Sequence, residues 1–285
     1  MIPAGAGQPH PRLQGDLFLR RIALLPTLCT LGNAACGFTA ITLATGAGLA
    51  CDWPNEIALY TAGWLIFAAM IFDMFDGYLA RRSRAASQFG AELDSLCDAI
   101  SFGAAPGFLL LQLGSHFSGR LAGEVFLLVA LLYMVCAVLR LARFNVQSSL
   151  DGKSHRTFQG LPSPAAAGCL AALVLLRYSP MPYPWLPEEI RLAVHWLAPV
   201  GATLVAVLMV SRIPYPHLAT RLLHRRRPFT ELVEVILAGF LIVFLKEVAL
   251  LGLCWLYVFI GPTVMLMRRR LPAPSEATEV MGTDR

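Results

Sequence analysis

The sequence predicts an all-α protein: a polytopic membrane bundle of about eight transmembrane helices, with both termini in the cytosol. The 285 residues are 56% hydrophobic and only 14% charged, whereas a soluble domain carries roughly 25% charged residues. Long apolar runs recur along most of the chain, and basic residues cluster in the short polar stretches between them. That pattern is typical of topology signals, so the net charge of +5 does not indicate a nucleic-acid partner.

A spanning helix needs about 20 mostly apolar residues. Residues 1–21 are polar and lack the pattern of a cleaved signal peptide, so the first apolar run is expected to be a permanent helix. The fifth and seventh predicted spans are short, and the last two share one apolar stretch divided only at Lys246. In order, the predicted spans are 22–48, 57–80, 91–113, 123–144, 162–178, 193–211, 231–246 and 248–267.

The distribution of basic residues supports an even number of spans. With both ends inside, most of the 23 Lys and Arg residues fall on the cytosolic side, as the positive-inside rule predicts. Those left outside are Arg120, Arg177, Arg191 and Lys246. The seven cysteines are scattered without a CxxC pair, which argues against a zinc site, and the absence of an internal repeat argues weakly against a transporter.

Four aspartates stand at the cytosolic edge of the second and third predicted helices. Asp73 and Asp76 lie one turn apart on one helix, and Asp94 and Asp98 lie one turn apart on the next. Four such charges would repel one another and be costly to desolvate. Mg²⁺ or Mn²⁺ would offset both costs, and two ions can stabilise the attacking and leaving oxygens of a displacement at phosphorus.

The residues around the aspartates suit a ligand that carries phosphate. Gly77 and Ala80 keep one helix face small, and Arg81 on that face can bind phosphate oxygens bidentately. Gly90 opens the facing helix in the same way, and Pro106 is expected to bend it. A structural explanation, in which an aspartate is a neutral hydrogen-bonding group or half of an Asp–Arg pair, does not account for four aspartates at this spacing.

The pattern D-x2-D-G-x2-A-R-x8-G-x3-D-x3-D from Asp73 to Asp98 resembles, without a gap, the signature of the CDP-alcohol phosphotransferases. Members of this family displace CMP from a CDP-linked lipid or alcohol with an acceptor hydroxyl. The resemblance implies that Asp73, Asp76 and Asp94 are metal ligands and that Asp98 is a ligand, the general base or both. The residues that it implies for CDP-diacylglycerol binding are Gly77, Ala80, Arg81 and Gly90.

Further stretches resemble the membrane-integral CDP-diacylglycerol–serine O-phosphatidyltransferases (phosphatidylserine synthases), which make phosphatidylserine and CMP from CDP-diacylglycerol and L-serine. They are residues 25–41, 90–107, 139–145, 158–167 and 208–216. Thr27 stands where the family has asparagine, and Gly107 where it has alanine. The organisation implied is a polar segment at 1–21, a catalytic membrane domain at 22–216, a basic loop with two helices at 217–270 and a disordered tail at 271–285.

The acceptor side of the site can be argued from residue chemistry. Arg140 and Arg143, at the cytosolic end of the fourth predicted helix, could bind the carboxylate of serine or the lipid phosphate. Asn145 and Ser163, the latter in the turn "GLPSP", could line the same opening. The alternatives are ordinary positive-inside charge for the arginines and loop punctuation for the turn.

Two other functions stay open from the sequence alone. The same chemistry could use another acceptor, such as glycerol phosphate, inositol phosphate or choline, or a donor with ether chains. A divalent-cation transporter could use the carboxylates as a transit site, although transport favours a site at the membrane midplane. The resemblance also implies a homodimer in the bacterial inner membrane, with the active site facing the cytosol.

Overall fold

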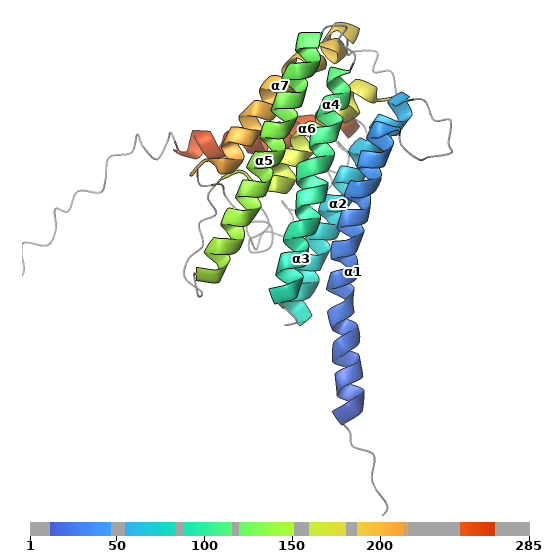
Figure 1. The fold of residues 1–285 in the computed structure, drawn as a ribbon, viewed down its shortest axis with the longest axis vertical. Coiled ribbons are helices and arrows are strands. Elements are labelled where there is room, and N and C mark those ends of the chain that lie inside the picture. The colour runs from blue at the N-terminus through green and yellow to red at the C-terminus, as the bar shows by residue number, and fades with distance from the viewer. Residues whose placement is uncertain are drawn as a thin grey trace, which may run out of the picture.

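The computed structural model of the chain is a bundle of helices (Figure 1). It describes residues 12–46, 55–83, 88–115, 120–150, 160–180, 187–213, 215 and 246–265. The helices are α1 (Arg12–Thr45), α2 (Asn55–Ser83), α3 (Gln88–Asp98), the π-helix η1 (Ala99–Ala104), α4 (Ala105–Gly114), α5 (Arg120–Leu150), α6 (Ser163–Tyr178), α7 (Glu188–Val210) and a further helix at Lys246–Met265. No strand occurs within these ranges, which confirms the predicted all-α class.

Six helical stretches in the described part of the chain are long and apolar enough to cross a membrane. The continuous run α3–η1–α4 is one of them, whereas α6 has only 16 residues and is shorter than the other apolar helices. The predicted seventh span at 231–246 lies outside the described residues, apart from Lys246, where the last helix begins. The total of eight spans and the cytosolic termini therefore remain predictions.

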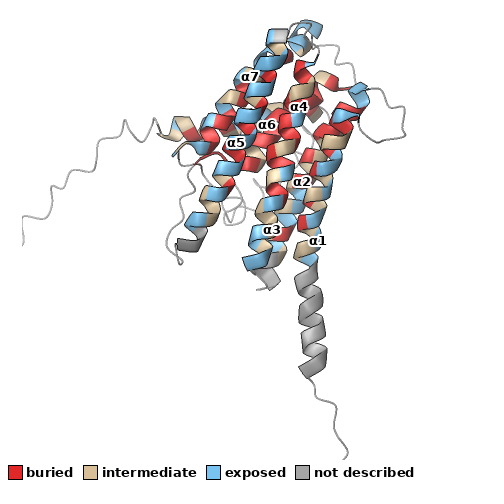
Figure 2. Ribbon diagram, viewed as in Figure 1, coloured by how far each residue is buried: buried red, intermediate tan, exposed pale blue. Residues whose placement is uncertain are grey.

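Helix α6 forms the centre of the bundle. All of its residues except Pro164, Ala165 and Arg177 are buried, and Figure 2 shows it as a red helix behind the more exposed α5. Its sequence SPAAAGCLAALVLLRY is rich in alanine, which lets neighbouring helices approach closely. The outer helices instead expose large apolar side chains, among them Leu121, Leu128 and Leu139 of α5, as expected for a surface in contact with lipid.

The π-helix η1 follows Asp98 directly and has an identifiable cause. Pro106 has no backbone N–H, so it cannot bond to the carbonyl of Phe102, its partner in an α-helix. The hydroxyl of Tyr133 on α5 donates to that carbonyl instead, at 2.9 Å. The expected disturbance at Pro106 thus takes the form of a wider turn just before it, between Asp98 and the start of α4.

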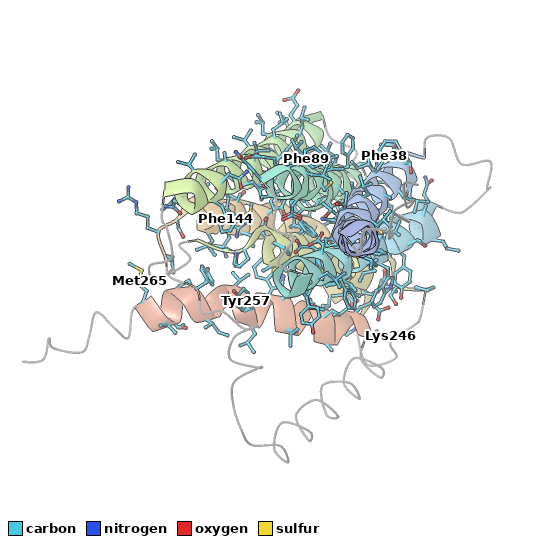
Figure 3. All side chains as sticks on the ribbon, turned by 90° about the horizontal axis from the view of Figure 1, so that it is seen from below. Phe38, Phe89, Phe144, Lys246, Tyr257 and Met265 are labelled. Carbon is cyan, nitrogen blue, oxygen red and sulfur yellow. The ribbon has the colours of Figure 1, made fainter. Side chains whose placement is uncertain are left out.

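The helix Lys246–Met265 runs across one side of the bundle. Figure 3 shows it lengthwise in a view in which α1 and α3 are seen nearly end-on. The buried carboxylate of Glu247 accepts hydrogen bonds from Tyr60 Oη on α2, at 2.7 Å, and from Ser179 Oγ after α6, at 3.2 Å. Further along the helix, Tyr215 Oη donates to the Val258 carbonyl at 3.1 Å. The helix is therefore fixed to the bundle at its first turn and again at Val258.

Candidate active site

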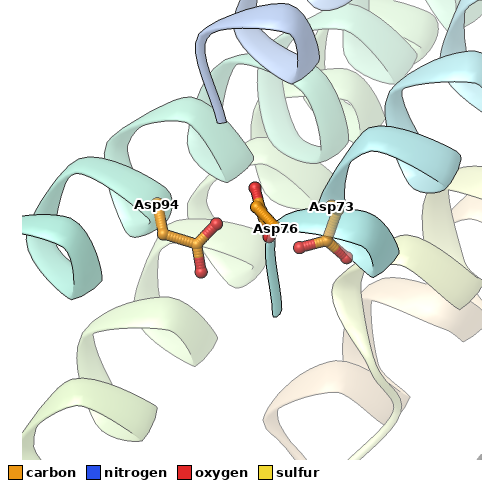
Figure 4. Close-up of side chains that lie close together, drawn as sticks. All are labelled: Asp73, Asp76 and Asp94. Carbon is orange, nitrogen blue, oxygen red and sulfur yellow. The ribbon is translucent and has the colours of Figure 1, made fainter. Parts of the chain in front are cut away.

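Three of the four predicted aspartates meet between α2 and α3. Asp73 and Asp76 lie one turn apart on α2, and Asp94 faces them from α3 (Figure 4). One carboxylate oxygen from each residue lies within 4.8 Å of those of the other two. Helices α2 and α3 run in opposite directions (Figure 1), and this arrangement brings the three oxygens together.

The acidic cluster Asp73–Asp76–Asp94 fits a divalent cation. Asp76 is 5% exposed, and Asp73 and Asp94 are half-buried. The buried Oδ1 of Asp94 has no hydrogen-bond partner among the described residues, and leaving a buried charged acceptor unpaired costs more than about 1–3 kcal/mol. Carboxylate oxygens are the ligands that hard cations such as Mg²⁺ prefer. A cation held here would satisfy that oxygen and relieve the repulsion among the three carboxylates.

Asp98 lies outside this cluster and is held by α1 instead. Its side chain is 8% exposed, and its Oδ1 accepts a hydrogen bond from Asn33 Nδ2 at 2.9 Å. The backbone carbonyl of Asn33 in turn accepts a bond from Ser101 Oγ at 2.8 Å. Gly37 permits this approach, because a Cβ there would lie 2.6 Å from Ser101 Cα. Asp98 follows Asp94 by one turn, and in the structure its Oδ1 contacts α1.

Arg140 lies beside the carboxylates on the side of α5. Its guanidinium lies within electrostatic range of Asp98 and Asp73. Its Nη1 donates to the buried Ser163 Oγ at the start of α6, at 2.7 Å, while its Nε is buried without a hydrogen-bond partner in the described part of the chain. An arginine that has donors to spare next to an acidic cluster is suited to bind an anionic ligand.

Arg143 and Asn145 lie further along α5 and have protein partners of their own. Arg143 Nη1 donates to the Val210 carbonyl at the end of α7, over a long 3.4 Å. Asn145 Oδ1 accepts a hydrogen bond from Ser95 Oγ of α3 at 3.0 Å. Asn145 thus connects α5 to the helix that carries Asp94. Two of the predicted acceptor residues, Arg140 and Ser163, meet directly.

The turn before α6 explains why Ser163 is placed where Arg140 can reach it. Gly160 has a φ of +90°, and a Cβ there would lie 3.0 Å from the Ser211 carbonyl oxygen. Its N–H donates to the Ile213 carbonyl at 2.8 Å, and the next N–H donates to the Leu208 carbonyl at 3.0 Å. These two hydrogen bonds attach the turn to the end of α7, so Gly160 and Leu161 have a structural role. The glycine is required there because other residues rarely adopt this φ.

The remaining predicted residues are placed only in part. Gly77 follows Asp76 on α2 and Gly90 precedes Asp94 by one turn on α3, and both are half-buried. The side chains of Ala80 and Arg81 lie outside the described residues. The sequence argument overlooked Asn33, although a polar amide inside a long apolar run was an available signal.

Comparison with known proteins supports the family resemblance that the motif indicated. Residues 23–210 match the family model for CDP-alcohol phosphatidyltransferases. The chain is 33% identical over 193 residues to the CDP-diacylglycerol–serine O-phosphatidyltransferase of Bacillus subtilis, covering 68% of this chain and 90% of that protein. It is 34% identical over 198 residues to the enzyme of the same name from Methanocaldococcus jannaschii, covering 70% and 76%.

A third relative, which has a different name, matches this chain over a similar number of residues. The archaetidylserine synthase of Methanothermobacter thermautotrophicus is 32% identical over 206 residues, which cover 72% of this chain and 74% of that protein. The family match includes α2 and α3, with the whole acidic motif, and α5, with Arg140. The resemblance read from the motif is confirmed: the chain is a membrane protein that belongs to the CDP-alcohol phosphatidyltransferase family.

Proposed function

We propose that this protein transfers the phosphatidyl group of CDP-diacylglycerol to the hydroxyl of L-serine, giving phosphatidylserine and CMP. The observation that carries the proposal is the acidic cluster of α2 and α3, with Asp98 and Arg140 next to it, in a chain of this family. The names of the relatives from Bacillus subtilis and Methanocaldococcus jannaschii support serine as the acceptor.

Asp73, Asp76 and Asp94 would hold the metal, Mg²⁺ or Mn²⁺, as a pair of ions. When bound, such ions neutralise the negative charge on the diphosphate and on the departing phosphate. The charge balance favours this arrangement, because three carboxylates would otherwise repel an anionic nucleotide. Gly77, Ala80, Arg81 and Gly90 would contact the nucleotide and diphosphate.

Asp98 acts as the general base in this mechanism. A carboxylate oxygen of Asp98 takes the proton of the serine hydroxyl, and the serine oxygen forms a bond to the phosphatidyl phosphorus. The bond from that phosphorus to the bridging diphosphate oxygen breaks, and CMP leaves with this oxygen. Asp98 is buried and is not one of the three carboxylates whose oxygens lie within 4.8 Å of one another, which supports its role as the proton acceptor.

Arg140 binds the acceptor in the same mechanism. The carboxylate of L-serine would accept hydrogen bonds from its guanidinium. This guanidinium bonds to Ser163 and lies within electrostatic range of Asp98. This position directs the serine hydroxyl toward the base. Arg143 and Asn145 would line the outer part of the same opening.

The proposed setting is the cytosolic edge of the bacterial inner membrane, in a homodimer. The aspartates stand near the ends of α2 and α3 that are joined by the basic segment around Arg81, and positive charge marks the cytosolic side. The acyl chains of the donor would stay in the bilayer while the nucleotide enters from the cytosol.

The test is CMP release by the purified protein with CDP-diacylglycerol and Mg²⁺ or Mn²⁺, with L-serine, glycerol 3-phosphate, inositol phosphate or choline added singly. We expect CMP only with L-serine. Release with another alcohol would keep the chemistry and replace the acceptor. A parallel assay with an ether-linked donor tests the alternative that the enzyme uses a donor with ether chains. Metal flux into proteoliposomes without CMP release would support a transporter and contradict the proposal.

A further inference from the structure

Asn33 is a wholly buried polar residue on α1, and it contacts the proposed base rather than a structural partner. It is 0% exposed, and its Nδ2 donates to Asp98 Oδ1 at 2.9 Å. The two residues are 65 positions apart in the chain. A charged acceptor makes such a hydrogen bond stronger than one between neutral groups.

The orientation of the Asn33 amide follows from the chemistry of its neighbour. An ionised carboxylate accepts hydrogen bonds only, so the NH₂ end of the amide must face Asp98. The other end, Oδ1, is buried and has no donor within the part of the chain that the structure describes. An asparagine kept only for packing would be expected to satisfy both ends. The unpaired Oδ1 of Asn33 therefore favours a functional role for this amide over a purely structural one.

The backbone of Asn33 is fixed independently of its side chain. Ser101, in the π-helix that follows Asp98, donates through Oγ to the Asn33 carbonyl at 2.8 Å. The close contact of Gly37 with Ser101 holds α1 against the same turn. These contacts with Ser101 hold the backbone of Asn33 in place beside Asp98. A residue that positions a reactive group must itself be held in this way.

The torsion that turns an aspartate carboxylate is broad and roughly two-fold, so either oxygen can face a substrate. A hydrogen bond to one oxygen removes this freedom. Asp98 Oδ1 is occupied by Asn33, and the acidic cluster of Asp73, Asp76 and Asp94 does not include Asp98. That leaves Oδ2 for the acceptor.

We infer that Asn33 is a positioning residue: by holding Oδ1 of Asp98, it directs Oδ2 to take the proton from the acceptor hydroxyl. The inference rests on the proposed function and adds to it a residue of α1 and the identity of the reacting oxygen. Asn33 acts through Asp98 and does not itself exchange a proton.

The test compares Asn33→Leu, which has a similar volume and no donor, with Ser101→Ala, which removes the bond to the same residue's backbone. We expect Asn33→Leu to lower kcat by about 10- to 100-fold, which corresponds to one hydrogen bond to a charged group. Its KM for CDP-diacylglycerol should stay unchanged. Ser101→Ala should lower kcat clearly less than Asn33→Leu does, because the hydrogen bond from Asn33 Nδ2 to Asp98 remains, while it lowers the melting temperature.

A second measurement does not depend on activity. Mn²⁺ alone should raise the melting temperature of Asn33→Leu as much as that of the wild type, because the acidic cluster is intact. If Asn33→Leu does not fold, Asn33→Ala repeats both measurements. A kcat equal to that of the wild type, or a loss of kcat matched by Ser101→Ala, would overturn the inference. A wild type that makes no phosphatidylserine would instead contradict the proposed function itself.

Discussion

At the scale of single residues, the acidic cluster is built from α2 and α3, whereas Asp98 is bound by Asn33 of α1. Regular helical spacing places Asp73 next to Asp76, and a short antiparallel connection brings Asp94 to face them. The partner of Asp98 could not be read from the motif, because Asn33 comes from a distant helix. Hydropathy marks α1 as a span without showing which of its faces turns inward.

Loss of a ligand from the acidic cluster should abolish turnover and leave the fold intact. We expect Asp94→Asn to lower kcat by at least about 100-fold, since even outer-shell changes at metal sites cost 10- to 100-fold. The rise in melting temperature caused by Mn²⁺ should also shrink. The matched control is Glu92→Gln, which neutralises an exposed carboxylate on the same helix. Near-normal turnover of Asp94→Asn would refute the assignment of this residue as a ligand.

The two arginines of α5 should affect the acceptor to different degrees. Arg140 lies beside Asp98, so we expect Arg140→Gln to raise the KM for L-serine by about 10- to 100-fold, the equivalent of one charge-assisted hydrogen bond. Arg143→Gln should raise it less, because Arg143 is directed toward the end of α7. Initial rates at varied serine and at varied CDP-diacylglycerol separate the effects. A change confined to the lipid donor would place Arg140 at its phosphate.

At the scale of elements, the apolar runs predicted where helices lie but not their local hydrogen-bond register. The third predicted span, 91–113, falls inside the continuous run of α3, η1 and α4. Pro106 signalled a disturbance in it, yet the wider π-turn depends on Tyr133 of another helix, which takes the carbonyl that the proline leaves free. A hydrogen bond between residues so far apart in the sequence cannot be predicted from neighbouring residues alone.

Close packing of α1 on the π-helix should be sensitive to a single methyl group. In Gly37→Ala the new Cβ meets the backbone of Ser101, so we expect a loss of about 1–3 kcal/mol in the free energy of unfolding and a lower kcat. Gly123→Ala on α5 is the control, since no described atom lies within 4 Å of a Cβ there. It should be neutral or stabilise by up to about 1 kcal/mol. Equal melting temperatures for the two variants in detergent would contradict the packing described.

At the scale of the whole molecule, composition predicted a membrane bundle but not the direction of each helix in it. The helix Lys246–Met265 has the length and hydropathy of a span, yet it runs across the bundle and is fixed by Tyr60, Ser179 and Tyr215. Hydropathy gives a length and an apolar content, whereas direction depends on such contacts. The central part of the bundle, from α1 to α7, coincides with the family match.

The most direct test of the central claim follows the oxygen of the acceptor. The purified protein is given CDP-diacylglycerol and L-serine labelled with ¹⁸O in its hydroxyl, and the lipid and nucleotide products are analysed by mass spectrometry. Attack of the serine oxygen on the phosphatidyl phosphorus predicts phosphatidylserine that retains the label and CMP that carries none. Absence of labelled phosphatidylserine, in a folded sample that binds Mn²⁺, would contradict the account.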